Sequence, residues 1–105
     1  MQKYLDQLNQ IKDNPSELSK LSLELAYQYA SESEKYITFI EDITKKKRSL
    51  LLEHPTAAKA EQVYELSDEG VWEKKMRIRL KSYEKLMSSI KRRLQDLEAE
   101  SRNQF

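Results

Sequence analysis

The sequence predicts an all-α fold: an antiparallel helical hairpin of the coiled-coil type with a short N-terminal helix. Three observations predict it. Apolar residues recur at helical spacing through most of the 105 residues. A single Gly and two Pro leave little of the turn chemistry that an all-β fold requires. The hydrophobic fraction is 38%, below the roughly 45–50% of an ordinary globular chain. Such a chain can bury a narrow seam between helices, so we expect one helical domain over residues 1–105.

The N-terminal segment predicts a short amphipathic helix over residues 2–12. Its apolar side chains stand at helical spacing: Tyr4, Leu5, Leu8 and Ile11. The helix ends at Asn14-Pro15, which is also a start signal. Asn14 suits the N-cap of a second helix, and Pro15 suits its first position.

The second helix is predicted to run from residue 15 to residue 53, because nothing interrupts it before His54-Pro55. Its apolar residues fall in one arc of the helical wheel. They are Leu18, Leu21, Leu25, Tyr29, Tyr36, Phe39, Ile40, Ile43 and Leu50. The repeat of seven from Tyr29 to Leu50 is typical of a seam against another helix.

The second half of the chain predicts a short helix over 57–66, capped by Thr56, and a long helix over 68–101. Its seam repeats every seven residues, at Met76, Tyr83, Ile90 and Leu97. That repeat does not continue in phase through 57–66, and the lone Gly70 lies at the phase change, which favours a break there. One kinked helix from 57 to 101 remains the alternative. We expect residues 102–105 to be frayed.

Two long helices joined at the His54-Pro55 corner fold back on one another. One seam leaves several apolar residues over: Leu23, Leu52, Val71, Trp72, Ile78 and Leu86. Either the N-terminal helix covers some of them or, as we favour, two hairpins pair as a homodimer.

Two charged residues, Glu32 and Lys47, lie on the apolar arc and suggest a fixed register between the helices. Reflection about the corner places residue 32 near residue 79 and residue 47 near residue 64. We therefore expect Arg77 or Arg79 opposite Glu32. Glu61 or Glu65 is expected opposite Lys47.

The residues that carry catalysis are scarce, so we expect no enzyme, no cofactor and no metal. There is no Cys, and His54, at the corner, is the single His. A catalytic triad or a zinc site needs more than that. We expect His54 to face solvent at a helix end. No apolar run approaches the roughly 18 residues of a membrane span. No leader is visible either, which favours the cytoplasm and no membrane.

The charge is segregated along the chain. Residues 1–44 carry four Lys against eight Asp and Glu, whereas residues 45–93 carry fourteen Lys and Arg against seven acids. The candidate binding residues lie in the basic region: Lys45, Lys46, Arg48, Lys74, Arg77, Lys81, Lys85 and Arg92. Lys74, Lys81, Lys85 and Arg92 share a stripe opposite the seam, with Arg77 beside it. Such a stripe can bind nucleic acid without sequence specificity, or it can be solvated or face a protein.

The stretch Asp68-Glu69-Gly70 followed by residues 74–94 (KKMRIRLKSYEKLMSSIKRRL) resembles the second half of small helical proteins of tailed phages of Gram-positive bacteria. Those proteins often lie in gene neighbourhoods for recombination or replication. The resemblance implies a viral accessory protein of the host cytoplasm, acting on DNA-handling machinery or blocking a host protein. It covers about a third of the chain and assigns no site residues.

Two functions follow from these observations. The first is a non-enzymatic helical interaction module, an adaptor or inhibitor that binds a protein partner. The alternative is an accessory factor that binds nucleic acid without sequence specificity through the basic stripe on residues 74–93.

Overall fold

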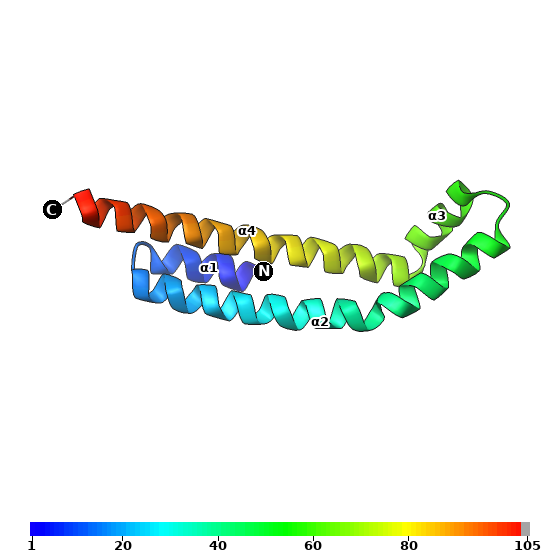
Figure 1. The fold of residues 1–105 in the computed structure, drawn as a ribbon, viewed down its shortest axis with the longest axis horizontal. Coiled ribbons are helices and arrows are strands. Elements are labelled where there is room, and N and C mark those ends of the chain that lie inside the picture. Colours follow the sequence, from blue (N-terminus) through cyan, green and yellow to red (C-terminus); the bar gives the residue numbers. More distant parts are fainter. Residues whose placement is uncertain (104–105) are drawn as a thin grey trace. The chain divides into compact units, whose positions relative to one another are not determined.

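A computed structural model of the protein describes residues 1–103, which form four helices and no strand (Figure 1). The helices are α1 (Gln2–Ile11), α2 (Pro15–Glu53), α3 (Ala57–Leu66) and α4 (Asp68–Asn103). The predicted all-α class is therefore confirmed. Two helices, rather than one kinked helix, follow the corner. Arg102 and Asn103 continue α4, so the frayed tail expected there is wrong for these two residues; residues 104–105 lie outside the described residues.

Helix starts follow the capping signals of the sequence. The Asn14 side chain accepts a hydrogen bond from the Glu17 backbone N–H at 3.2 Å, and α2 begins at the next residue, Pro15. The Thr56 side chain accepts a hydrogen bond from the Lys59 backbone N–H at 3.1 Å, and α3 begins at the next residue, Ala57. Each cap satisfies one of the backbone donors that a helix start leaves without an intrahelical partner.

Ser67 alone separates α3 from α4 and caps both helices. Its N–H donates to the Tyr64 carbonyl at 3.0 Å, and its hydroxyl accepts from the Gly70 N–H at 3.1 Å. A Cβ atom on Gly70 would lie 2.0 Å from the Tyr64 carbonyl oxygen. The lone Gly therefore marks a close backbone approach between the end of α3 and the first turn of α4.

Contacts divide the chain into two compact units. Unit 1 comprises residues 1–30 and the chain from residue 79 onward, and unit 2 comprises residues 31–78. Helices α2 and α4 each contribute one part to unit 1 and another to unit 2.

Unit 1 is a three-helix packing of α1 with parts of α2 and α4. Tyr4 of α1 meets Tyr83 of α4 edge-on, with ring centroids 6.0 Å apart. Leu86, which the hairpin alone left over, is buried in the same core. The N-terminal helix thus covers part of the apolar surplus, as one of the two sequence-based alternatives predicted. The buried core of unit 1 comprises Tyr4, Leu8, Leu18, Leu21, Leu25, Tyr83, Leu86 and Ile90.

Unit 2 has a smaller core between α2 and α3. It comprises Ile43, Leu50, Ala60 and Tyr64, with Val63 and Trp72 packed against it. Phe39 and Ile40, which we expected in the seam, are 46% and 48% exposed. They lie at the two edges of the apolar arc, and the small core covers only its middle. The Phe39 ring still lies 5.0 Å from that of Trp72.

Candidate functional site

The basic residues predicted on α4 are all exposed. Lys81, Lys85 and Arg92 lie in unit 1, and Lys74 and Arg77 lie in unit 2. Among residues 1–103, no carboxylate lies within 4 Å of Lys74, Lys81, Lys85 or Arg92. Arg77 differs, because its guanidinium lies 3.4 Å from the Glu73 carboxylate on the same helix. These four residues, and not Arg77, therefore keep their charge available to a partner.

The cluster at residues 45–48 does not form one surface. Lys45 pairs with Glu41 on the same face of α2 at 3.3 Å, and Arg48 is exposed. Lys46 is half-buried. Lys47 turns toward the unit 2 core. Only part of this cluster can contribute to binding.

Lys47 lies near residue 64, as the predicted register places it, but its ion-pair partner differs from the predicted one. Its ammonium sits 4.8 Å from the centroid of the Tyr64 ring, so residue 47 does lie near residue 64. Its carboxylate partner, however, is Glu73 at 3.5 Å, and the predicted pairing with Glu61 or Glu65 is wrong. The Tyr64 ring occupies the position opposite Lys47, and Glu73 is the acid within reach beside it.

Glu32 is buried, at 5% exposure, as its place on the arc predicts. Arg77, one of its two expected partners, pairs with Glu73 instead. The pairing of Glu32 with Arg79 stays a prediction.

Glu73 is the centre of a polar cluster in unit 2 that the sequence did not reveal. It is 7% exposed and lies near two cations, Lys47 and Arg77. The Tyr36 hydroxyl donates a hydrogen bond to it at 3.3 Å. A hydrogen bond with Tyr36 raises the pKa of the Arg77 guanidinium, and the Glu73 charge raises it further. A buried carboxylate requires such partners.

The Glu73 cluster brings together side chains from three helices, which explains why the sequence did not reveal it. Tyr36 and Lys47 come from α2, Tyr64 from α3 and Arg77 from α4. The i,i+4 spacing of Glu73 and Arg77 is the one local signal, and such pairs are common on solvated helix faces.

Tyr64 is the aromatic member of this cluster, and its titration is displaced. Burial, and after it the charge of Glu73, raise the pKa of its phenol to about 12. In the unfolded chain the phenol titrates near its ordinary value of 10.0. The folded protein therefore holds the proton through a range of pH in which the unfolded chain releases it.

The free energy of unfolding should consequently fall as pH rises from about 10 to about 12, by up to about 1.4 kcal/mol per pH unit from this group. The contribution is fully present below pH 10 and lost as the pH passes the folded-state pKa. Urea unfolding of the wild type and Tyr64→Phe at several pH values should show a smaller slope for the variant. Tyr27→Phe, at an exposed position, is the control and should keep the wild-type slope; equal slopes for all three proteins would contradict the assignment.

The polar groups of the Glu73 cluster contact one another within unit 2. Its carboxylate is already surrounded by a phenol and two cations, and the cluster is buried around Glu73 and Tyr64. Within residues 1–103, no group of three His, Asp or Glu side chains could hold a metal ion. His54 is half-buried at the corner, where we had expected it to face solvent. Among the described helices, none is both long and apolar enough to cross a membrane.

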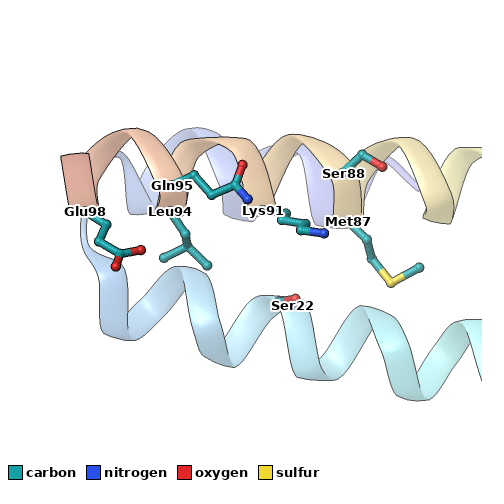
Figure 2. A pocket seen from close by; sticks show the side chains of 7 residues that line it. All are labelled: Ser22, Met87, Ser88, Lys91, Leu94, Gln95 and Glu98. Atoms are coloured by element: carbon teal, nitrogen blue, oxygen red, sulfur yellow. The ribbon is translucent and has the colours of Figure 1, made fainter. Parts of the chain in front are cut away.

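Unit 1 contains an open groove of about 400 Å³ between α2 and α4. Figure 2 shows Met87 and Leu94 extending from α4 toward α2, where Ser22 lies. Polar side chains complete the lining: Ser88, Lys91, Gln95 and Glu98. Beyond this groove, the Tyr29 hydroxyl donates to the Glu84 carboxylate at 2.7 Å and links the same two helices. The groove thus combines an apolar floor with charged and polar edges.

The chain was compared with protein families, curated proteins and solved structures. No family model, no curated protein and no solved structure matches it.

Proposed function

We propose that this protein is a non-enzymatic helical interaction module, an adaptor or inhibitor that binds a protein partner. In this proposal α2 and α4 form an antiparallel hairpin, two copies pair as a dimer, and the protein acts in the cytoplasm. The resemblance of residues 68–70 and 74–94 to small phage proteins supports a viral accessory role in a host cell. The all-helical structure of residues 1–103 is compatible with an interaction module.

One observation carries the proposal: four exposed cations of α4 have no acidic partner among the described residues. They are Lys74, Lys81, Lys85 and Arg92. Basic side chains on one face of a helix attract a surface of opposite charge and accelerate its association. We propose that an acidic face of another protein supplies that charge.

The same four cations favour a second candidate function, nucleic-acid binding without sequence specificity. Each cation would neutralise one phosphate of the nucleic acid, and the affinity for nucleic acid would fall steeply as the salt concentration rises. Proteins that hold single strands also stack bases on aromatic side chains. No aromatic residue interleaves with the four cations on their face of α4, so we rank this function second.

One experiment separates the two functions. All four cations are changed to Glu, which should leave helicity unchanged because the side chains are exposed. The matched control changes Lys3, Lys20, Lys35 and Lys59, which are also exposed, to Glu. Both variants carry the same net charge. Wild type and variants are tested for capture of proteins from nuclease-treated host lysate and for retention on single- and double-stranded DNA at low and high salt.

We expect the wild type to capture a protein in a salt-sensitive manner. The variant with four Glu substitutions in α4 should no longer capture this protein, whereas the control variant should still capture it. Retention on DNA that falls with salt and is lost only in the α4 variant would establish the second function instead. Equal loss in both variants would show that net charge, and not the four cations, determines binding, and the proposed surface would be wrong.

A further inference from the structure

We infer that the groove of unit 1 binds α4 of a second copy of this chain, antiparallel, about a two-fold axis near Leu94 and Gln95. The inference rests on the dimer of the proposed function and assigns its surface. Four observations in unit 1 support it. They are the side of the helix packing that α1 leaves open, the lining of the groove, a lysine without an acidic partner among the described residues, and the order of charges along α4.

Helix α1 leaves this side of the seam open. The Arg93 guanidinium donates to the Lys12 carbonyl, just past the end of α1, at 3.2 Å, so Arg93 faces α1. Lys91 precedes it by two residues and points about 200° away around the helix. Lys91 lines the groove. Unit 1 therefore has three helices with one open side, where a further helix would complete a four-helix bundle.

The floor of the groove suits a helix rather than a small polar ligand. Met87 and Leu94 are half-buried and present apolar atoms between the two helices (Figure 2). Ser22, on the opposite wall, is small and leaves room for a ridge of side chains from another helix. The groove thus provides apolar area that an amphipathic helix can cover.

Lys91 has no acidic partner among the described residues and is free to pair with one on another molecule. It is exposed, and no carboxylate among residues 1–103 lies within 4 Å of it. Glu98 lines the same groove, is 62% exposed at its side chain and is contacted by Arg102 at 2.6 Å. A Glu on a second molecule can therefore reach Lys91 without any rearrangement of the core.

The order of charges on α4 makes this face complementary to itself. Lys91 and Glu98 are seven residues apart, so they lie on nearly the same face of the helix, on either side of Leu94. A two-fold axis midway between them places Lys91 against Glu98 of the second copy, and Glu98 against Lys91 of the second copy. Such an interface is isologous, with each contact made twice. A second copy of the chain therefore supplies both the charges and the apolar residues that the groove requires.

A charge exchange tests the pairing directly. Lys91→Glu, Glu98→Lys and the double variant Lys91→Glu/Glu98→Lys are compared with the wild type by sedimentation equilibrium at low salt. Circular dichroism melts check that each variant is folded. Lys75→Glu, exposed on another face of α4 and outside the groove, is the matched control. Each single variant should raise the dimer dissociation constant at least about tenfold, because like charges then face each other twice.

The double variant restores opposite charges at both contacts and should return the dissociation constant to within about threefold of the wild type. Lys75→Glu should leave it unchanged. A wild-type dimer that the single variants do not weaken, or that the double variant fails to restore, would overturn the assigned surface and leave the proposed dimer standing. A monomer at every concentration would overturn both, without affecting the capture experiment on the four cations.

Discussion

Leu25→Ala should lower the free energy of unfolding by about 2–5 kcal/mol, the largest effect that we expect from any single substitution in this chain. Leu25 is 0% exposed and lies in the core of unit 1 with Leu18, Tyr83 and Ile90. Removing its side chain loses the transfer free energy of buried methyl groups and leaves a cavity between three helices. Urea unfolding followed by circular dichroism measures the change.

The matched control is the same substitution two residues earlier on the same helix. Leu23 is 74% exposed, so Leu23→Ala should change the free energy of unfolding by no more than about 0.5 kcal/mol. The two Leu positions are about 200° apart around α2. A comparable loss at both would show that the face of α2 assigned to the core of unit 1 is wrong.

The helices could be predicted from the sequence because their determinants are local. Asn14 and Thr56 are capping residues, and both accept the hydrogen bonds that such residues make at helix starts. His54-Pro55 ends α2 where the residue before Pro disfavours the helical conformation. The repeat from Met76 through Ile90 places buried residues on the core side of α4.

The partners of buried charges could not be predicted, because they depend on contacts between distant residues. Reflection about the corner correctly brought Lys47 to Tyr64, but it did not identify Glu73 as the acid. That pairing depends on how α3 and the start of α4 pack against α2. The break at Ser67 sets this packing, and the heptad pattern contains no measure of it.

The candidate site was predicted unevenly for a related reason. Because α4 is one continuous helix, its helical wheel alone predicts which residues point away from the seam. The four cations predicted there are all exposed: Lys74, Lys81, Lys85 and Arg92. The run at residues 45–48 contains four consecutive basic residues, and consecutive residues point about 100° apart on a helix. A run of charge in sequence is therefore not a patch in space: Lys45 pairs with Glu41, whereas Lys47 contacts Glu73 and the Tyr64 ring.

Gly70→Ala should destabilise the protein by about 1–3 kcal/mol, although the substitution lies in a helix. Helix propensity alone predicts the opposite, a gain of about 1 kcal/mol. A Cβ atom at residue 70 would lie 2.0 Å from the Tyr64 carbonyl oxygen and 2.9 Å from its carbonyl carbon. Both atoms belong to the backbone of α3. The same Tyr64 carbonyl oxygen accepts the hydrogen bond from the Ser67 N–H. No side-chain rotation relieves such a contact, so the end of α3 must move away from α4.

The movement expected in Gly70→Ala can be observed separately from the loss of stability. Trp72, the single Trp of the chain, lies two residues after Gly70, and its ring is stacked on Tyr36 with centroids 6.1 Å apart. Displacement of α3 should therefore change the emission of Trp72 in the folded state as well as the urea midpoint. Glu65→Ala, exposed on α3, is the control and should stay within about 0.5 kcal/mol of the wild type with unchanged emission. A Gly70→Ala variant as stable as the wild type, or more stable, would mean that propensity outweighs the contact and that α3 and α4 are not in this close approach.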